Sequence, residues 1–254
     1  MQSDLQRAID AIHVRFGDQA LVRATRLPDV QPWPTGLSAV DRLSGIGGLP
    51  RGRVSVLQGP PGSGKFSLGL DLLAHATREL SQAVVLDLGR GFDPWTIQPR
   101  DPDLSALAVV RPPNSSAAGE AAVALARAGA SFLLVLDPLP EGALAPLESA
   151  AAHSSCAVVA IDEGSDRPVA HASSLTIGFQ RIRWVWDRGL LVGLRARLVC
   201  LKNKLAAPGA AAELEVRYSL GARLLTAEPV REVSETPEGE ILELPQWRAR
   251  SAAG

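Results

Sequence analysis

The stretch that decides the fold is residues 54–65, Val-Ser-Val-Leu-Gln-Gly-Pro-Pro-Gly-Ser-Gly-Lys. Its opening residues, 54–57, indicate a buried strand, and the residues from Lys65 onward indicate a helix. The residues between them that fit the phosphate-loop motif Gly-x-x-x-x-Gly-Lys-Ser/Thr are Gly59, Pro60, Gly62, Ser63, Gly64 and Lys65. Glycines let the backbone wrap a phosphate, while backbone N–H groups and the helix N-terminus supply positive charge. The stretch therefore predicts a nucleotide-binding site, and the alternative is a glycine-rich turn without a ligand.

The eighth position of the motif, where a Ser or Thr hydroxyl ligates Mg²⁺, is Phe66. A benzyl group cannot ligate a hard cation. Ser67 follows, but one residue further along a helix points about 100° away. The sequence therefore predicts ATP or ADP as the cofactor, places Phe66 in its site, and argues against Mg²⁺ and metal-assisted hydrolysis.

Strands and helices alternate from this stretch onward. The predicted strands are 54–57, 83–87, 107–110, 132–137 and 156–161, and the predicted helices are 65–80 and 117–128. After residue 172 we expect only short antiparallel strands, at 175–177, 190–192, 198–200 and 214–216. The pattern predicts an α/β fold: a mostly parallel, twisted sheet with helices on both faces and antiparallel strands at its C-terminal side.

Composition excludes several classes of protein. The 254 residues are 46% hydrophobic and carry a net charge of −1, so no bulk electrostatic field draws the chain to nucleic acid or membrane. Cys156 and Cys200 lie in apolar runs and have no metal-ligand spacing, which favours buried free thiols in a reducing compartment. No apolar run approaches the length of a membrane span. We therefore expect a cytoplasmic protein without a metal site or a membrane partner.

The two ends of the chain differ from its core, and we predict an arm at residues 1–25, a core at 26–221 and a flexible acidic tail at 222–254. The arm has a helix-spaced apolar face made of Leu5, Ile9, Ile12 and Phe16. The tail is rich in glutamate and carries an apolar cluster made of Ile241, Leu242, Leu244 and Trp247. We expect both sets to dock on a partner, and the alternative is that both pack on their own core.

Several segments resemble the bacterial RecA core, over about residues 5–221. They are residues 35–41, the Gly-Gly-Leu-Pro-Arg-Gly-Arg stretch at 47–53, the phosphate loop, and Lys-Asn-Lys-Leu-Ala-Ala-Pro at 202–208. The resemblance implies a RecA-like phosphate-loop core. It also implies that Asp93 and Asp137 belong to the nucleotide site, although Asp137 could instead cap the next turn. Lys202 and Lys204 match lysines that reach the nucleotide of a neighbouring subunit in RecA-like filaments, and the alternative is a solvated basic turn.

The departures from RecA decide the predicted function. The glutamate that activates the attacking water in RecA falls two residues after Asp87, where this chain has Gly89, followed by Arg90. A glycine cannot act as a general base. The glutamine that senses the γ-phosphate falls on Glu163, whose charge would repel that phosphate. We therefore predict no catalytic residue and a degenerate ATPase rather than an enzyme.

The DNA-binding loops also look reduced. The segment between Asp137 and Ile161 leaves no room for the first RecA loop, and the second would be residues 164–172, with only Asp166 and Arg167 charged. A basic, aromatic strip exists, made of Arg181, Arg183, Trp184, Trp186, Arg188, Arg195 and Arg197. An amphipathic hairpin explains this strip better than a nucleic-acid site, given the neutral overall charge. We expect weak or no direct DNA binding.

A shortened RecA-like core with a degenerate site and an acidic tail is most similar to the ImuA-type proteins of the bacterial mutasome. That resemblance implies an adaptor in SOS mutagenesis and translesion synthesis, with RecA and an ImuB-like, polymerase-like protein as partners, and self-association through the arm. Two alternatives remain: a DNA-dependent ATPase that acts as a recombination mediator, and a structural scaffold that binds no nucleotide.

Overall fold

The computed structural model describes residues 30–164 and 168–220, two short pieces at 225–227 and 231–232, and four isolated positions near the N-terminus. Those four, Arg7, Asp10, Ala11 and Val14, have helical backbone and exposed side chains. The predicted docking residues Leu5, Ile9, Ile12, Phe16, Ile241, Leu242, Leu244 and Trp247 lie outside the described residues. Their role as docking residues stays a prediction.

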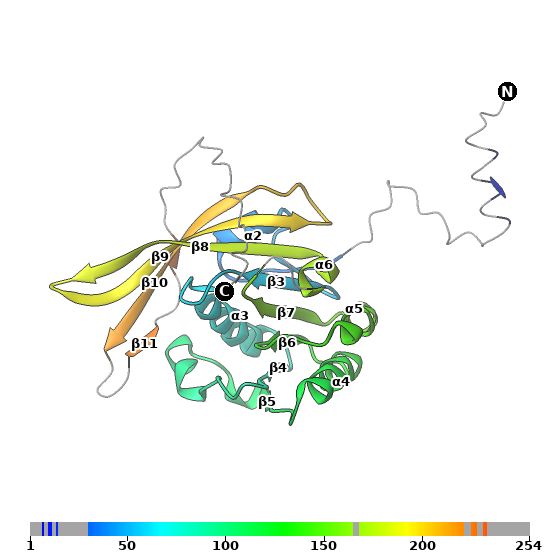
Figure 1. The fold of residues 1–254 in the computed structure, drawn as a ribbon, viewed down its shortest axis with the longest axis horizontal. Helices are drawn as coiled ribbons and strands as arrows, with labels where there is room; N and C mark the ends of the chain where they lie inside the picture. The colour runs from blue at the N-terminus through cyan, green and yellow to red at the C-terminus, as the bar shows by residue number, and fades with distance from the viewer. Residues whose placement is uncertain are drawn as a thin grey trace, which may run out of the picture.

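One large sheet organises the described part of the chain (Figure 1). Its strands in chain order are β3 (Val54–Gln58), β4 (Ala83–Leu86), β5 (Leu107–Val110), β6 (Phe132–Val135), β7 (Ala157–Asp162), β8 (Leu175–Asp187), β9 (Leu190–Asn203), β10 (Ala211–Leu220), β11 (Leu225–Ala227) and β12 (Arg231–Glu232). The spatial order is β11-β10-β9-β8-β3-β7-β6-β4-β5, and β12 pairs with β10. Every neighbouring pair from β8 to β5 is parallel, whereas β8, β9, β10 and β11 pair antiparallel. The predicted fold class is confirmed.

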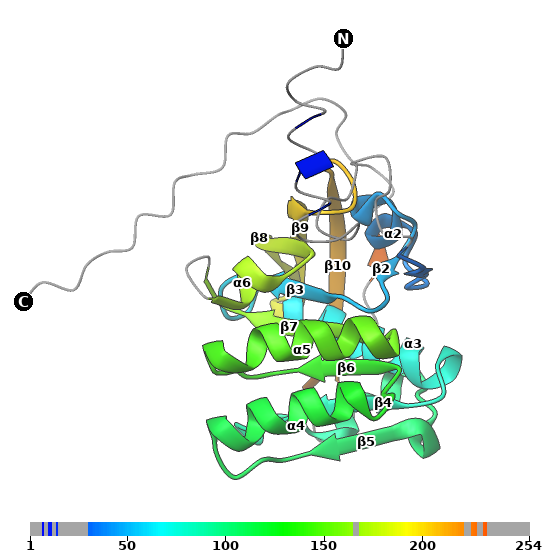
Figure 2. The same cartoon turned by 90° about the vertical axis from the view of Figure 1, so that its right-hand side faces the viewer.

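Helices cover both faces of the parallel part (Figure 2). Helices α4 (Ser115–Arg127) and α5 (Glu141–Ser154) pack on one face, where alanines of α4 meet valines of the strands. Helices α2 (Ser38–Ser44) and α3 (Lys65–Glu79) pack on the other face. Helix α6 (Pro168–Ala172) follows β7, and a two-stranded sheet joins β1 (Pro32–Trp33) to β2 (Leu49–Pro50).

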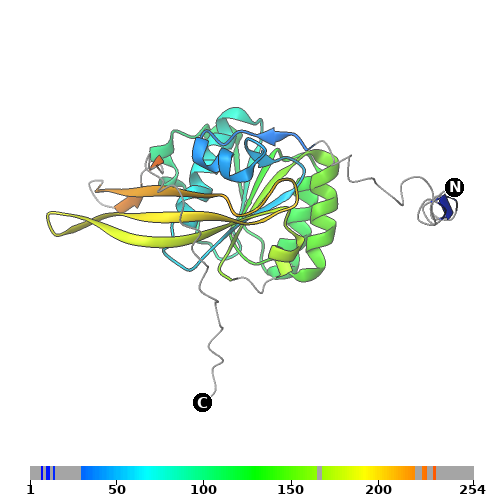
Figure 3. The ribbon, with the colours of Figure 1, turned by 90° about the horizontal axis from the view of Figure 1, so that it is seen from above.

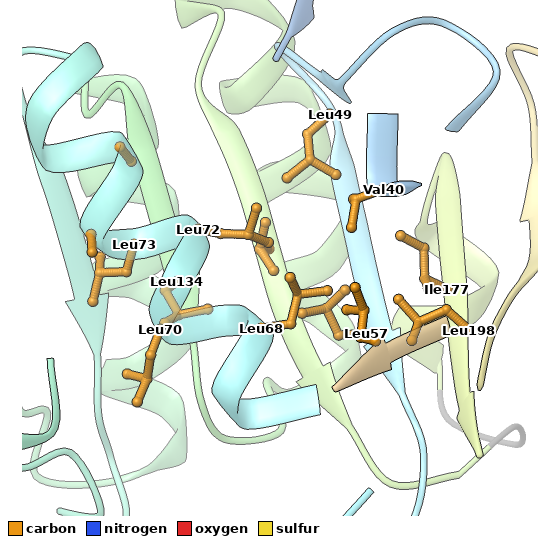
Figure 4. Close-up of a cluster of buried hydrophobic side chains, with 14 of the residues drawn as sticks. Val40, Leu49, Leu57, Leu68, Leu70, Leu72, Leu73, Leu134, Ile177 and Leu198 are labelled. Atoms are coloured by element: carbon orange, nitrogen blue, oxygen red, sulfur yellow. The ribbon is translucent and has the colours of Figure 1, made fainter. Parts of the chain in front are cut away.

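The core on the α3 side is built from leucines that the helix and the strands place face to face (Figure 4). Leu68 and Leu72 of α3 are fully buried, as are Leu57 of β3 and Leu134 of β6. Burial of one such side chain stabilises the fold by about 1.5–3 kcal/mol. This packing fixes the start of α3 against the end of β3, which is where the predicted phosphate loop lies.

The second half of the chain is more regular than the sequence pattern predicted. Residues 190–192 and 198–200 belong to one strand, β9, rather than to two, and β8 extends ten residues beyond the predicted 175–177. The polar and glycine residues that break the apolar pattern, such as Gly193 and Arg195, lie inside the ladder that pairs β9 with β8 and β10. The distal halves of β8 and β9 form a two-stranded ribbon that projects beyond the rest of the sheet (Figures 1 and 3).

Three further segments bear on the sequence expectations. Five residues, 136–140, connect β6 to α5, and two residues, 155–156, connect α5 to β7, so this segment holds no long loop. Strands β11 and β12 fall within the range predicted as the tail, and both pair with β10. Among the described residues, no helix has the length and apolar character needed to cross a bilayer.

Candidate nucleotide-binding site

A cavity of about 490 Å³ lies where the parallel strands end, beside the loop that joins β3 to α3. Its lining residues are Pro61, Gly62, Ser63, Gly64, Lys65, Phe66, Ser67, Leu136, Asp137, Pro138, Ile161, Glu163, Leu194 and Tyr218. Parallel strands bring their carboxyl ends to one edge of a sheet, and ligands of α/β proteins bind there. Most of the predicted phosphate-loop residues, together with Asp137, therefore line the same cavity.

The loop that the sequence predicted to hold phosphate connects a fully buried strand to the first turn of α3. Gly64 caps that helix with a φ of +97°, a left-handed conformation that glycine adopts without strain. A Cβ atom on Gly64 would also lie 3.3 Å from Cδ1 of Leu194. A side chain here would both strain the backbone and crowd the ribbon, so the glycine in the motif is required by local structure.

Two polar side chains of the loop are buried. The Lys65 ammonium donates hydrogen bonds to the backbone oxygens of Gly59 at 2.7 Å and Pro60 at 3.2 Å. The Ser63 hydroxyl is inaccessible to solvent and has no hydrogen-bond partner among the described residues. A buried hydroxyl without a partner is costly, and phosphate oxygens are strong acceptors. The donor set of the loop therefore fits a nucleotide phosphate.

The same loop does not fit the metal that usually accompanies such a nucleotide. Phe66 lines the cavity with 37% of its surface exposed, at the position where the motif requires a hydroxyl. Among the described residues, no group of three or more His, Cys, Asp and Glu side chains could hold a metal ion. The aromatic ring offers Mg²⁺ no hard oxygen ligand.

Asp137 lies at the end of β6 and faces the position where the resemblance implies a general base. Its Oδ2 accepts a hydrogen bond from the backbone N–H of Gly89 at 2.9 Å. A Cβ atom on Gly89 would lie 2.7 Å from Asp137 Oδ1, closer than real Cβ contacts come. The glycine at the position where the resemblance implies a general base therefore allows Asp137 to approach the loop that follows β4. Glu163 supplies the second carboxylate of the cavity.

The other acidic residues that the resemblance singled out do not line the cavity. Asp87 is buried, where it accepts hydrogen bonds from the N–H groups of Gly91 and Phe92 and pairs with Arg111 at 3.0 Å. Asp93 caps a short 3-10 helix by accepting a hydrogen bond from the Trp95 N–H at 3.0 Å. Both carboxylates therefore shape the segment after β4.

Sequence patterns missed Leu194 of β9 and Tyr218 of β10 as cavity residues. Both come from the antiparallel strands, which the fold returns to the end of β3 after more than 130 residues. Burial raises the pKa of the Tyr218 hydroxyl above its usual value, and the nearby Arg181 opposes that shift. No motif marks either residue, although Tyr218 is the only tyrosine in the chain.

Lys202 and Lys204 lie at the opposite end of the parallel strands from the cavity, because Asn203 pairs with Leu175 at the start of β8. Lys202 donates to the backbone oxygen of His171 at 2.7 Å, and Lys204 donates to that of Ala172 at 3.4 Å. Burial, and then the nearby Lys204, lower the pKa of Lys202. Within one chain these lysines hold the C-terminus of α6, and contact with a neighbour's nucleotide stays a prediction.

The basic, aromatic strip maps onto the ribbon of β8 and β9. Arg181 donates to the Gly62 backbone oxygen at 3.2 Å, and its guanidinium carbon lies 4.2 Å from the Trp184 ring centroid. Arg195 faces Glu213 and Glu215 of β10, at 3.9 Å from each. One member of the strip thus contacts the phosphate loop and another is engaged by carboxylates, so the strip is not a uniform basic surface.

Comparison with known proteins defines the class. The family described as the RecA N-terminal domain matches residues 3–159, and the chain belongs to that family. It is 28% identical to Protein RecA of Chlorobium limicola over 85% of this chain and 74% of that protein. It is 30% identical to Protein RecA of Streptomyces avermitilis, over 86% of this chain and 70% of that protein. A crystal structure of the RadB recombinase matches with a TM-score of 0.58 at 15% identity, covering 78% of this chain and 98% of that one, which supports the fold alone. The RecA resemblance is confirmed at the level of the family.

Proposed function

We propose that this protein is a RecA-like adaptor of the DNA-damage response that binds ATP or ADP without RecA-like turnover. It would act in SOS mutagenesis and translesion synthesis by binding RecA, an ImuB-like polymerase-like protein, or both. Membership of the RecA family supports the RecA-like part of the proposal. The observation that supports binding without turnover is the hydrogen bond from Gly89 to Asp137, at a site with Phe66 in place of a metal-ligating hydroxyl. The adaptor role and the partners rest on the resemblance to the ImuA-type proteins.

The physical argument concerns what each residue of the cavity can do. The loop N–H groups, Ser63 and Lys65 can hold phosphate oxygens, since each is a donor beside the cavity. Hydrolysis needs a base to activate water, and the position that would supply it has no side chain. Binding without turnover is what this set of residues supports best.

Steady-state phosphate release, measured with and without single-stranded DNA, tests the absence of turnover. We expect no release above background in either condition, for the parent protein and for Lys65→Ala alike. Release that DNA stimulates and that Lys65→Ala abolishes would contradict the proposal. It would favour the alternative of an ATPase that acts as a recombination mediator.

A second candidate is a scaffold that binds no nucleotide, and the position of Lys65 favours it. The Lys65 ammonium already donates to two carbonyl oxygens of its own loop. A nucleotide would have to draw the ammonium away from them. Calorimetric titration with ATP and ADP separates the two candidates, because the scaffold shows no binding heat with either.

The partners are tested by capture of the full-length protein with purified RecA and with the polymerase-like protein. We expect at least one of them to bind, and removal of residues 1–24 to weaken that binding if the arm docks in trans. The melting curve of the shortened protein is the control. If the arm packs on its own core, its removal should instead lower the melting temperature and leave partner binding unchanged.

A further inference from the structure

The outer part of the β8–β9 ribbon exposes an apolar surface. We call residues 181–190 the ribbon tip. Its large apolar side chains and their exposed fractions are Ile182 (46%), Trp184 (37%), Trp186 (62%) and Leu190 (56%). Neighbouring exposed apolar side chains on one projecting element are unusual for a free surface and mark interaction sites. Nothing in the described part of the chain covers them.

The ribbon tip is also basic. It carries Arg181, Arg183 and Arg188 against one acidic residue, Asp187. Arg181 lies over the Trp184 ring, so positive charge and aromatic surface occupy the same place. A partner that fits this surface therefore needs apolar side chains, preferably an aromatic anchor, interspersed with carboxylates.

Residues 233–247 of the same chain have that composition. The segment contains four glutamates and no lysine or arginine. The last seven of these residues, 241–247, include Ile241, Leu242, Leu244 and Trp247. The negative charge and the apolar side chains of residues 233–247 thus complement the arginines and the apolar side chains of the ribbon tip.

Residues 233–247 follow β12, and the end of β12 lies close enough to the ribbon tip for this segment to reach it. Glu232 pairs with Leu214 of β10, Leu214 pairs with Ala196 of β9, and Ala196 pairs with Arg181 of β8. Three strand spacings separate Glu232 from Arg181, or about 14 Å. Extended chain spans about 3.3 Å per residue, so residues 233–240 can bring Ile241 to any part of the ribbon tip.

We propose that residues 233–247 bind the ribbon tip of their own chain, with Trp247 and its apolar neighbours on Trp184 and Trp186 and with glutamates beside the arginines. The bound segment covers a surface that contacts the phosphate loop, because a Cβ atom on Gly62 would lie 3.2 Å from Arg181 Nη1 and 3.8 Å from the Trp184 ring. The segment is then a built-in competitor for any acidic, apolar partner of the ribbon. The inference goes beyond the adaptor function and does not depend on nucleotide binding.

Two tryptophans of the full-length protein provide an internal comparison. Trp95 and Trp186 have nearly equal exposed fractions in the described structure, 67% and 62%, and only Trp186 lies on the ribbon tip. Hydroxyl-radical footprinting with mass spectrometry measures the oxidation rate of each. We expect Trp186 to oxidise about tenfold more slowly than Trp95. This difference corresponds to a ratio of about ten between molecules whose residues 233–247 are bound to the ribbon tip and molecules in which they are free.

The variants are made in the full-length chain. In Trp247→Ala/Leu244→Ala, and in Glu240→Lys/Glu243→Lys, the two rates should become equal, whereas Gln246→Ala should leave the protection of Trp186 in place. Equal rates in the parent protein would overturn the proposal, as would protection that survives both double variants. Protection that disappears on dilution assigns the covering segment to a second copy and rejects binding within one chain. None of these outcomes alters the turnover measurement.

Discussion

Gly89 and Asp137, 48 residues apart in the sequence, are joined by a hydrogen bond of 2.9 Å from the Gly89 N–H to Asp137 Oδ2. The bond places the carboxylate of the β6 strand end against the loop that follows β4. Because residue 89 is a glycine, no Cβ atom prevents this close approach, and the same glycine occupies the position where the RecA resemblance implies a general base.

Replacement of Gly89 by alanine tests that arrangement. The new Cβ atom would lie 2.7 Å from Asp137 Oδ1, so Asp137 must move and its hydrogen bond weakens. We expect the free energy of unfolding to fall by about 1–2 kcal/mol. Gly91→Ala is the matched control, because nothing lies within 4 Å of its Cβ position. Urea denaturation of both variants measures the difference, and equal stabilities would refute the steric argument.

Replacement of Phe66 by threonine should make nucleotide binding depend on Mg²⁺. The threonine hydroxyl would restore the hard oxygen ligand that the loop lacks. We expect the parent protein to bind ATP equally well with Mg²⁺ and with a chelator, and the variant to bind more tightly with Mg²⁺. Phe66→Ala, which removes the ring without adding a hydroxyl, is the control. A parent protein whose affinity already falls on chelation would contradict this prediction.

Lys65→Ala should weaken nucleotide binding without unfolding the protein. Loss of one charge-assisted phosphate contact costs about 1.5–3 kcal/mol, which raises the dissociation constant about 10- to 150-fold. Titration calorimetry measures the affinity, and circular dichroism checks the fold. Arg127→Ala, an exposed cation at the end of α4, should leave the affinity unchanged. Equal affinities of the parent and Lys65→Ala would show that the loop has only a structural role.

The two cysteines should be unreactive in the folded protein. Burial raises the pKa of the Cys156 thiol from 9.0 to about 12, and it also raises that of Cys200. Folding therefore favours the protonated Cys156 thiol. Its contribution to the free energy of unfolding is complete below about pH 9 and is lost as the pH rises from about 9 toward about 12. A thiol reagent at pH 8 should label neither cysteine until denaturant is added. Rapid labelling of the native protein would show that the apolar surroundings are open.

DNA binding should be weak and should collapse with salt. The chain has a net charge of −1, and Glu213 and Glu215 engage Arg195 of the ribbon. We expect binding of single-stranded DNA, measured by fluorescence anisotropy, to fall steeply between about 50 and 200 mM salt. Tight, salt-resistant binding that is lost in Arg183→Ala and kept in Arg127→Ala would identify the strip as a nucleic-acid site.

Local sequence was sufficient for the five parallel strands from β3 to β7. It was wrong for residues 175–177, which were expected to be antiparallel but pair parallel with β3 at the start of β8. The spacing of glycines before Lys65 and the apolar runs at β3, β6 and β7 predicted the loop and its flanking strands, because each depends on neighbours in the sequence. The cavity residues Leu194 and Tyr218 could not be predicted this way, since only the return of β9 and β10 brings them to β3. Asp87 and Asp93 were matched to acidic residues of RecA by resemblance alone. In the structure their carboxylates accept hydrogen bonds from nearby backbone N–H groups and do not line the cavity.

The central position of β3 has a consequence for synthesis on the ribosome. Its two hydrogen-bonding neighbours are β7 and β8, which follow it by about a hundred residues. Until β7 has emerged, both edges of β3 are unpaired, and the edge that pairs with β8 stays unpaired until residues 175–178 follow. Unpaired apolar strands invite association with other chains, and distant pairings slow folding. The nascent chain should therefore need chaperone protection until β8 is complete, and release from the ribosome before that point should yield aggregates rather than a smaller folded unit.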